Sequence, residues 1–398
     1  MSQRNPLPAI QPMIRPVLLS VVTLVITFSQ VVTLVAGQRG SINRWHLAGT
    51  IHQLAAQHRE QFQIPGMSVA IAQRGRIVYQ QGFGYRNQEQ RLPATVQTRY
   101  RLASISKSVT SVLVMLLVEQ GRLDLDRELG GYLPGLSREH RAIRLAQLLS
   151  HQSGIRHYQP NDPDTLKFEY CHKAISFFQD DDLKFPPGEK FLYSTHAYTM
   201  LGAALEKATN KSFRQLVIDE ITIKQNLPTL RPEDRSINDP LRATLYNNVA
   251  TGDSPAGKPQ KIRNMPVTAD DISWKCPGGG LESTAPDLCR FALQLMNGSL
   301  LKDANRQQLW TARKLKSGKV TNYGLGWVLG ATNDHAYVAH SGSQLGAKSY
   351  LRIYPKEEIV VVILSNCRSH RPQDLGDALS QKVLAQPYPT RRFLPRRR

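Results

Sequence analysis

Segments typical of β-strands lie near both ends of this chain, and their placement constrains the fold more than any other feature. They are residues 67–73 and 76–81 near the beginning and residues 337–340, 348–354 and 359–364 near the end. Arg74-Gly75 separates the first two segments and is typical of a tight hairpin turn. Residues 140–310 favour helices and loops. We therefore predict an α+β fold, in which an antiparallel sheet built from both chain ends is flanked by helices and lies beside a mainly helical lobe.

Three segments near these strands have the apolar spacing of helices. Residues 42–62 are amphipathic, and residues 372–385 follow the last strand segment. Residues 104–119 include the apolar run 112–118 and end before Gly121, which suits the left-handed cap of a helix. The chain has 398 residues, of which 41% are hydrophobic. This is enough for a large core in one domain or in two closely packed subdomains.

An apolar segment near the N-terminus predicts export. Residues 17–36 are mostly Val, Leu, Ile and Thr, and as a helix they match the hydrocarbon thickness of a bilayer. Arg4 and Arg15 precede the segment and no acidic residue does, as in signal sequences. Small residues at 35–37 would allow cleavage, the length favours an uncleaved anchor, and a buried core helix is a further alternative. We expect residues 17–36 to contact the membrane, with the chain in the periplasm or on the extracytoplasmic face, anchored or secreted.

Composition limits the partners that the chain can have. We assign residues 1–40 to a signal anchor or signal peptide, residues 41–388 to a single folded domain and residues 389–398 to a basic tail. The formal net charge is +20, but the basic residues are spread along the chain without a nucleic-acid-binding motif, so we expect no nucleic-acid partner. The four cysteines lack the spacing of a metal or redox site. Two disulfides remain possible in an exported protein, but we favour buried free thiols.

A motif at the start of the central apolar helix suggests a nucleophile. Ser104 and Lys107 form S-x-x-K, and three residues along a helix place both side chains on one face. The free backbone N–H groups and the dipole at a helix start favour negative charge on Ser104. A serine hydroxyl needs a neighbouring base, and a lysine acts as one only if burial or nearby positive charge lowers its pKa. The apolar character of this helix would supply the burial.

The motif alone does not identify a site, because S-x-x-K also arises by chance. A second copy, Ser299 to Lys302, follows a helix stop and opens no long apolar helix. Taken by itself, Ser104 could equally be a helix cap beside a surface lysine. Residues 278–280 are three glycines without the lysine of a phosphate loop, and we expect them to bring backbone close to a cleft before a helix capped by Ser283 or Thr284.

Three further segments resemble the class C β-lactamase-related enzymes of the β-lactamase and penicillin-binding-protein superfamily. Residues 187–195 (PGEKFLYST) resemble the P-G-x-x-F-x-Y-S-N stretch of this family, and residues 148–155 (LLSHQSGI) resemble its L-L-x-H-x-S-G segment. His340-Ser341-Gly342 lies on a predicted strand where the family has K-T-G or H-x-G. These motifs occur in the family's order, and the similarity extends from about residue 45 to residue 385. The resemblance implies a β-lactamase/transpeptidase-like fold.

Within that family, further stretches are most similar to the mitochondrial serine β-lactamase-like proteins. These stretches are residues 150–158, 193–195 and 323–327. In the first of them we interpret His151 as a residue that orders a loop rather than as a base. Tyr198, one helical turn after residue 194, is interpreted as a packing residue.

The resemblance also implies roles for individual residues. Ser104 would attack a carbonyl and form an acyl-enzyme, Lys107 would accept its proton, and the Tyr193 phenol would relay protons. We expect Lys107 to lower the pKa of Tyr193, which would then act partly as a phenolate. The backbone N–H groups of Ser104 and Ser343 would form the oxyanion hole. No cofactor and no metal are implied.

Three residues are candidates for substrate binding. Gly342 would let the substrate approach the strand edge, because glycine has no Cβ. Thr195 stands where the β-lactamases have Asn, and His340 replaces the Lys that commonly meets an antibiotic's carboxylate. Both replacements weaken the case for β-lactam hydrolysis.

The resemblance therefore implies a serine hydrolase, acting through an acyl-enzyme on a small peptide, ester or cell-wall-type amide substrate. The alternative is a non-catalytic penicillin-recognising or scaffold protein of the same fold. The oligomeric state is left open.

Overall fold

The computed structural model describes residues 46–159, 162, 166–250 and 262–385. The chain divides into two compact units, residues 1–50, of which residues 46–50 are described and helical, and residues 51–398, which carry the remaining features. The predicted export segment at residues 17–36 and the basic tail at residues 389–398 lie outside the described residues. Within the described ranges, no helix is both long enough and apolar enough to cross a membrane.

An antiparallel sheet forms the centre of the larger unit, and within the described residues it has seven strands in the order β3-β2-β1-β12-β11-β10-β9. The strands are β1 (Gly66–Gln73), β2 (Arg76–Asn87), β3 (Leu92–Pro93), β9 (Val328–Thr332), β10 (His335–Gln344), β11 (Ala347–Tyr354) and β12 (Ile359–Ser365). β1 and β12 are neighbours, with Met67 opposite Ser365, so the two ends of the chain meet in the middle of the sheet. The predicted α+β fold with a sheet from both chain ends is confirmed.

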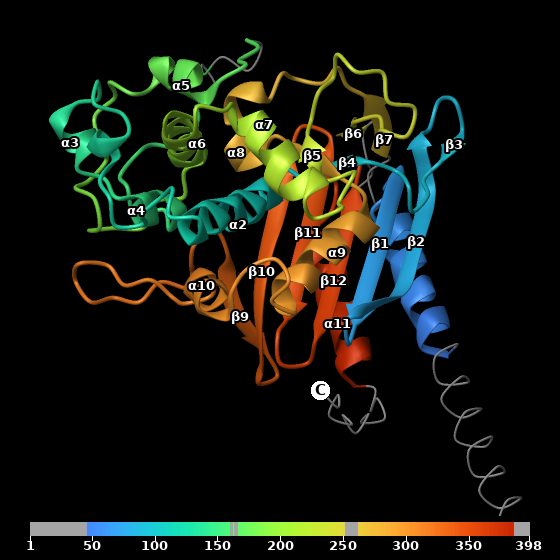
Figure 1. Ribbon diagram of the computed structural model, residues 1–398. Coiled ribbons are helices and arrows are strands. Elements are labelled where there is room, and N and C mark those ends of the chain that lie inside the picture. The colour runs from blue at the N-terminus through green and yellow to red at the C-terminus, as the bar shows by residue number, and fades with distance from the viewer. Residues whose placement is uncertain (1–45, 160–161, 163–165, 251–261, 386–398) are drawn as a thin grey trace, which may run out of the picture. The chain divides into compact units, whose positions relative to one another are not determined.

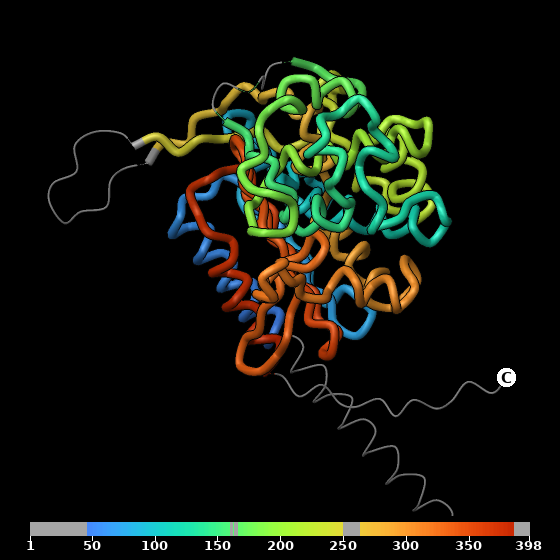
Figure 2. The backbone as a smooth tube through the Cα atoms, turned by 90° about the vertical axis from the view of Figure 1, so that its left-hand side faces the viewer, coloured from blue at the N-terminus to red at the C-terminus, as the bar shows by residue number. Residues whose placement is uncertain are grey.

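Local sequence explains why these strands form. Arg74 and Gly75 both have positive φ, of 52° and 76°, as the tight turn between β1 and β2 requires. Every residue of β12 is buried, which explains its unbroken apolar sequence. Figures 1 and 2 show helix α9 (Ala285–Met296) on one face of the sheet and helix α11 (Pro372–Leu384) on the other. The predicted helix at residues 42–62 is helical over residues 46–61 of the described chain.

The middle of the chain forms the predicted helical lobe, to the upper left in Figure 1. Its helices are α3 (Arg138–Arg141), α4 (Leu145–Leu149), α5 (Cys171–Ala174), α6 (Thr195–Thr209), α7 (Phe213–Val217) and α8 (Cys276–Gly279), and α10 (Asp303–Leu309) lies near the sheet. Short strands that the sequence analysis did not predict pair as β4-β8-β5 and β6-β7; they are β4 (Tyr100–Arg101), β5 (Arg231–Pro232), β6 (Tyr246–Ala250), β7 (Ile262–Pro266) and β8 (Leu281–Ser283).

Helix α2 (Ile105–Glu119) runs along the boundary between the sheet and the helical lobe (Figure 1). Twelve of its residues are buried, and the chain turns at Gly121 with φ of 69°, as predicted. All four cysteines of the chain are buried and free, in agreement with the preferred interpretation of the sequence. Because α2 is enclosed, the side chains of its first turn lie in an environment of low polarity.

Candidate active site

Ser104 lies at the N-terminus of helix α2 with its hydroxyl available. It is the N-cap residue, yet its side chain caps no backbone N–H, which leaves Oγ for other partners. The preceding residue, Ala103, has φ of 49°, an uncommon conformation for a residue with a side chain. Such backbone strain is concentrated at functional sites. The turn at Ala103 therefore sets the position of Ser104 at the helix start.

The Lys107 side chain reaches back one turn to Ser104. Its Nζ lies 3.2 Å from Ser104 Oγ, 3.1 Å from Thr195 Oγ1 and 2.6 Å from the carbonyl oxygen of Gly278. The lysine is completely buried. Burial lowers the pKa of Lys107 well below its usual value, and repulsion from the Lys275 ammonium adds to this effect.

The three oxygen partners of Lys107 suit either a neutral amine or an ammonium. A neutral amine has two N–H donors and one lone pair, whereas an ammonium has three donors and no lone pair. The Gly278 carbonyl and the Thr195 hydroxyl can accept the two N–H groups. In the neutral form the lone pair would then face the Ser104 hydroxyl, whereas an ammonium would donate to all three oxygens. Lys107 is therefore placed beside Ser104 as a general base would be, and its lowered pKa favours that role.

Tyr193 lies on the other side of this pair, just before helix α6. Lys107 Nζ is 4.8 Å from the centroid of its ring. Burial raises the pKa of Tyr193 above its usual value, although a hydrogen bond with the Ser104 side chain acts in the opposite direction. The expectation that Lys107 lowers the pKa of Tyr193 and makes it partly a phenolate is wrong, because burial raises this pKa and Lys107 is not among the groups that lower it. Tyr193 is a neutral phenol that can donate and accept protons.

His151 holds the loop that carries Tyr193. Its backbone has φ of 60°, and its carbonyl oxygen accepts the Leu192 N–H at 2.8 Å. Its Nδ1 accepts the Ser194 N–H at 3.2 Å, and its ring centroid lies 4.3 Å from that of Tyr193. Burial lowers the pKa of His151 well below its usual value. This agrees with the sequence interpretation of His151 as a loop-ordering residue.

Thr195 contacts the base rather than an open substrate site. Its hydroxyl is a partner of Lys107, its N–H donates to His157 Nδ1 at 3.1 Å, and only 3% of the residue is exposed. Burial, followed by repulsion from Lys107 and Lys275, lowers the pKa of His157 to about 4, so His157 stays a neutral acceptor. Thr195 therefore helps to position Lys107, and its role in substrate binding stays a prediction.

His340 lies behind the site, with both ring nitrogens in use. Its Nδ1 is 2.8 Å from the Ser341 carbonyl oxygen, which can only accept, so Nδ1 carries the proton. Its Nε2 then accepts from the Tyr323 hydroxyl at 2.9 Å. Burial lowers the pKa of His340 to about 3, which leaves the ring neutral. The expected substrate-binding role of His340 is not supported, because neither nitrogen is left for a ligand.

Gly342 is needed for a contact within the protein. A Cβ at this position would lie 2.9 Å from Ala103 Cβ and closer still to the Leu102 carbonyl oxygen. The prediction that Gly342 makes room for substrate is therefore wrong about what lies against it. The missing side chain lets β10 approach the backbone that leads into Ser104.

The backbone N–H of Ser343 lies on an open edge of β10. Both hairpins of β10 have two-residue turns, which follow Thr332 and Gln344. Residues that flank such turns form hydrogen-bonded pairs, and N–H directions alternate along a strand. The N–H of Ser343 therefore points away from β11, past Ala339, where pairing with β9 ends. β10 approaches the residues before Ser104 at Gly342, and the oxyanion hole of Ser104 and Ser343 N–H groups stays a prediction.

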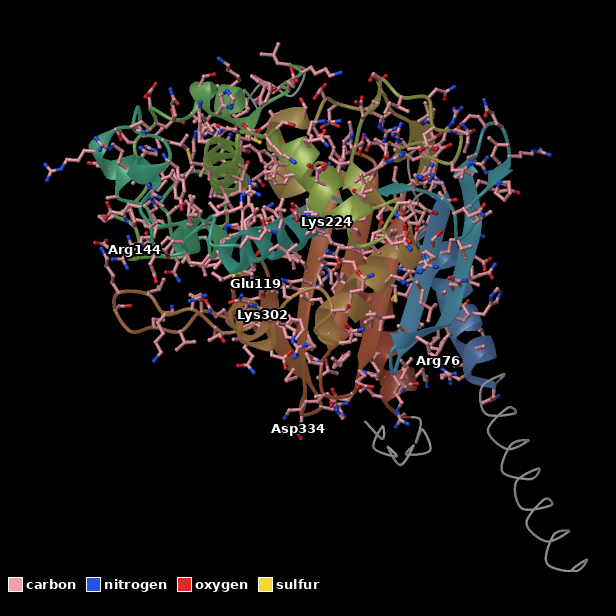
Figure 3. The ribbon with its side chains drawn as sticks, in the orientation of Figure 1. Arg76, Glu119, Arg144, Lys224, Lys302 and Asp334 are labelled. Carbon is pink, nitrogen blue, oxygen red and sulfur yellow. The ribbon has the colours of Figure 1, made fainter. Side chains whose placement is uncertain are left out.

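The second S-x-x-K copy is far from this constellation. Figure 3 shows Lys302 beside Glu119, at the opposite end of α2 from Ser104. The Lys302 N–H donates to Glu119 Oε1 at 2.8 Å. Ser299, Lys302 and their surroundings therefore have a structural role.

The sequence analysis missed several groups at the site. Lys275, His157 and Tyr323 were not assigned to it, although His157 and Tyr323 lie in the stretches 150–158 and 323–327 that carry the family similarity. The glycines at residues 278–280 were the available signal, since we expected their backbone to approach a cleft. The Gly278 carbonyl does bind Lys107, and Thr284 caps helix α9 as one of the two expected residues. Among the described residues, no group of three or more His, Cys, Asp or Glu is arranged to hold a metal ion.

Comparisons with known proteins agree with this architecture. The Beta-lactamase family model matches residues 51–385. The mitochondrial serine beta-lactamase-like protein LACTB of Bos taurus is 26% identical over 395 residues, which covers 74% of this chain and 69% of that protein. The D-amino acid amidase of Ochrobactrum anthropi SV3, solved with D-phenylalanine, superposes with a TM-score of 0.72 at 19% identity, covering 85% of this chain and 99% of the amidase. EstCE1, described as a hydrolase with promiscuous acyltransferase activity, superposes with a TM-score of 0.71 at 23% identity, covering 86% and 99%. The chain belongs to the Beta-lactamase family.

Proposed function

We propose that this protein is a serine hydrolase that cleaves a small ester or amide through an acyl-enzyme on Ser104. The observation that carries the proposal is the buried Lys107 amine, 3.2 Å from Ser104 Oγ and with a lowered pKa. A lysine in this state can take the hydroxyl proton at neutral pH, as activation of a serine nucleophile requires. The family consists mostly of serine hydrolases, and the similar structures include an amidase and a hydrolase with acyltransferase activity.

The first half of the reaction forms the acyl-enzyme. Lys107 accepts the proton of Ser104 as Oγ bonds to the substrate carbonyl carbon. The carbonyl oxygen becomes an oxyanion, which the N–H groups of Ser104 and Ser343 would stabilise. When the intermediate collapses, the bond to the leaving alcohol or amine breaks. The proton taken by Lys107 passes through the Tyr193 hydroxyl to that leaving group.

The second half of the reaction releases the acyl group. A water molecule attacks the acyl carbon while Tyr193 accepts a proton from it and passes a proton to Lys107. The ester bond to Ser104 then breaks, and Oγ regains its proton from Lys107. Because its raised pKa keeps Tyr193 a neutral phenol, it can both donate and accept a proton.

An ester or simple amide suits the site better than a β-lactam. A neutral, enclosed His340 stands where the β-lactamases have a lysine that meets the antibiotic's carboxylate. The Thr195 hydroxyl binds Lys107 and is not offered to a substrate amide. Neither position supplies the contacts through which an efficient β-lactamase holds its substrate.

A fluorophosphonate probe, which reacts with activated serines, tests the proposal. We expect wild-type protein to be labelled and Ser104→Ala to lose all labelling. The matched control is Ser299→Ala, which removes the serine of the second S-x-x-K motif and should label like wild type. A folded wild-type chain that never reacts would refute the proposal and favour a non-catalytic penicillin-recognising or scaffold protein. In that case a fluorescent penicillin would distinguish recognition from inertness.

A substrate panel then separates the remaining alternatives. We expect turnover of short-chain aryl esters or of amino acid amides to exceed turnover of the chromogenic cephalosporin nitrocefin. A D-alanyl-D-alanine peptide reports activity on cell-wall-type amides. Nitrocefin hydrolysis as fast as ester hydrolysis would contradict the assignment of Thr195 and His340.

The cellular location is a separate proposal that rests on the sequence of residues 17–36. We propose that this segment exports the chain and contacts the membrane, so that the hydrolase acts outside the cytoplasm. Fractionation of cells that express the full chain tests it, with a variant lacking residues 1–39 as the control. Full-length protein found only in the soluble cytoplasmic fraction would refute it.

A further inference from the structure

A cavity of about 580 Å³ lies between the sheet and helix α11. Residues of β9, β10, β11 and α11 line it. Pockets that bind small molecules typically have volumes of this size. Ser104, Lys107, Tyr193 and Ser343 do not line the cavity, so the proposed reaction makes no use of it.

The register of β10 and β11 places this cavity on the opposite face of the sheet from the nucleophile. Ser341 pairs with Tyr350, and both residues line the cavity. Successive residues of a strand project from opposite faces, so Ser349 projects away from the cavity. On that other face its hydroxyl donates to the Leu102 carbonyl oxygen at 2.6 Å, two residues before Ser104. The cavity is therefore separate from the candidate active site.

Arg352 brings a buried positive charge to the wall of the cavity. Only 4% of its side chain is exposed. Its Nε donates to the Tyr350 hydroxyl at 2.5 Å, and its Nη1 donates to the Tyr354 hydroxyl at 3.0 Å and lies 2.6 Å from Asp377 Oδ1. The guanidinium carbon lies 4.2 Å from the ring centroid of Tyr337. These contacts hold the guanidinium in one orientation.

Part of the guanidinium remains for a ligand. A guanidinium has five N–H donors. The contacts that the described residues make with Arg352 involve Nε and Nη1, and they leave the two N–H groups of Nη2. The Tyr350 hydroxyl accepts from Arg352, and burial raises the pKa of Tyr350, so this hydroxyl keeps a proton that it can donate. The cavity wall therefore offers neighbouring hydrogen-bond donors, one of them charged.

Another buried arginine of this chain shows how such a charge can be satisfied. The Arg101 side chain is fully buried and binds two carboxylates, Glu233 at 2.8 Å and Asp270 at 2.5 Å. Within the described chain, Arg352 pairs with one carboxylate, that of Asp377, whose side chain is 46% exposed and therefore screened by water. Burying a charge is costly unless it is paired. A second carboxylate, supplied by a ligand in the cavity, would complete the pairing of Arg352.

We propose that this cavity binds a small monocarboxylate that carries an apolar ring or chain, and that Arg352 holds the carboxylate. Arginine and carboxylate form short, charge-assisted hydrogen bonds. Val328, Ala339 and the Tyr337 ring line the same cavity and give the apolar part of the ligand a surface to contact. The proposal does not depend on the proposed hydrolase activity, because the two sites lie on opposite faces of the sheet.

Calorimetric titration of the full chain with benzoate tests the proposal, with benzyl alcohol as the uncharged counterpart of the probe. We expect benzoate to bind at least tenfold more tightly than benzyl alcohol, because only benzoate carries a carboxylate. Arg352→Met removes the charged donors and should weaken benzoate binding by about 10–100-fold. Ser104→Ala should bind benzoate as wild type does, which distinguishes this cavity from the candidate active site.

A second variant leaves Arg352 and its partners in place. Gln373 lines the cavity from the first turn of α11, where a carboxylate suits the helix dipole. Gln373→Glu puts a negative charge into the cavity, and this charge repels a carboxylate ligand, so benzoate binding should fall at least tenfold without loss of Tm. Gln90→Glu, at an exposed position in the turn between β2 and β3, adds the same charge elsewhere and should change nothing.

Three results would overturn the proposal. The first is wild-type protein that does not bind benzoate at millimolar concentrations, and the second is benzyl alcohol that binds as tightly as benzoate. The third is wild-type affinity in folded Gln373→Glu, which decides the matter even if melting curves show that Arg352→Met has lost its fold. Absence of fluorophosphonate labelling at Ser104 would refute the proposed function but would leave these binding results unchanged.

Discussion

Replacing Gly342 by alanine tests how the site is assembled, because this glycine lies between strand β10 and the residues before Ser104. A Cβ at residue 342 would lie 2.9 Å from Ala103 Cβ, whereas ordinary contacts begin near 3.4 Å. The clash with the Leu102 carbonyl oxygen is more severe, and relieving it requires β10 and this backbone to separate by about 1 Å. The added methyl group therefore moves the Ser343 N–H away from Ser104.

This displacement gives two expected magnitudes. Misplacing a catalytic group by about 1 Å typically costs about 10²-fold in rate, so kcat/KM or the labelling rate of Gly342→Ala should fall by about that factor. Overpacking a close contact costs about 1–3 kcal/mol in the free energy of unfolding, so the Tm should fall by only a few degrees. The loss of activity should therefore be much larger than the loss of folded protein explains.

The assay combines fluorophosphonate labelling rates with thermal melting of the same samples. Gly135→Ala is the matched control, since a Cβ at Gly135 meets nothing within 4 Å. It should keep both the wild-type labelling rate and the wild-type Tm to within a degree or two. A folded Gly342→Ala variant that is labelled as fast as wild type would refute the proposed contact between β10 and the segment before Ser104.

Three further predictions follow from the charges and hydrogen bonds at the site. The folded-state pKa of Lys107 lies below the unfolded value of about 10.5, so the folded state loses stability as the pH falls from about 10.5 towards the folded pKa. Lys107→Met should therefore abolish labelling yet raise the Tm, and the gain in Tm should be larger at pH 7 than near pH 10. An equal gain in Tm at both pH values would contradict a lowered pKa of Lys107. Tyr193→Phe removes the hydroxyl that bonds to Ser104 but keeps the ring, so turnover should fall by about 10²–10⁴-fold in steady-state assays, and unchanged turnover would exclude Tyr193 as the proton relay. Burial would raise the pKa of Glu233, but the ion pair with Arg101 outweighs it and lowers this pKa from 4.5 to about 2. The carboxylate therefore contributes stability above pH 4.5 that is lost as the pH falls towards 2. Glu233→Gln should lower the Tm at pH 7 and make the Tm depend less on pH between 4.5 and 2, and a Tm that falls as steeply as in wild type over this range would count against the ion pair.

The sequence by itself determined the architecture and the position of the candidate nucleophile. Apolar strand segments at both chain ends predict the sheet because strand pairing and burial follow local alternation and length. Ser104 and Lys107 are three residues apart on one helix, so their proximity follows from helix geometry alone. Strands such as β4 and β5, of two residues each, were missed because so short a segment has no periodicity to read.

The tertiary structure alone decided the protonation and the orientation of the groups around Ser104. The lowered pKa of Lys107 depends on burial and on repulsion from Lys275, and its position depends on the Gly278 carbonyl 171 residues away. The same burial keeps Tyr193 a phenol, in contrast to the expected phenolate. Whether Gly342 faces substrate or Leu102 depends on how strand β10 packs on the start of helix α2. Charge state and contact direction are set by groups that come together only on folding, and therefore no local pattern in the chain encodes them.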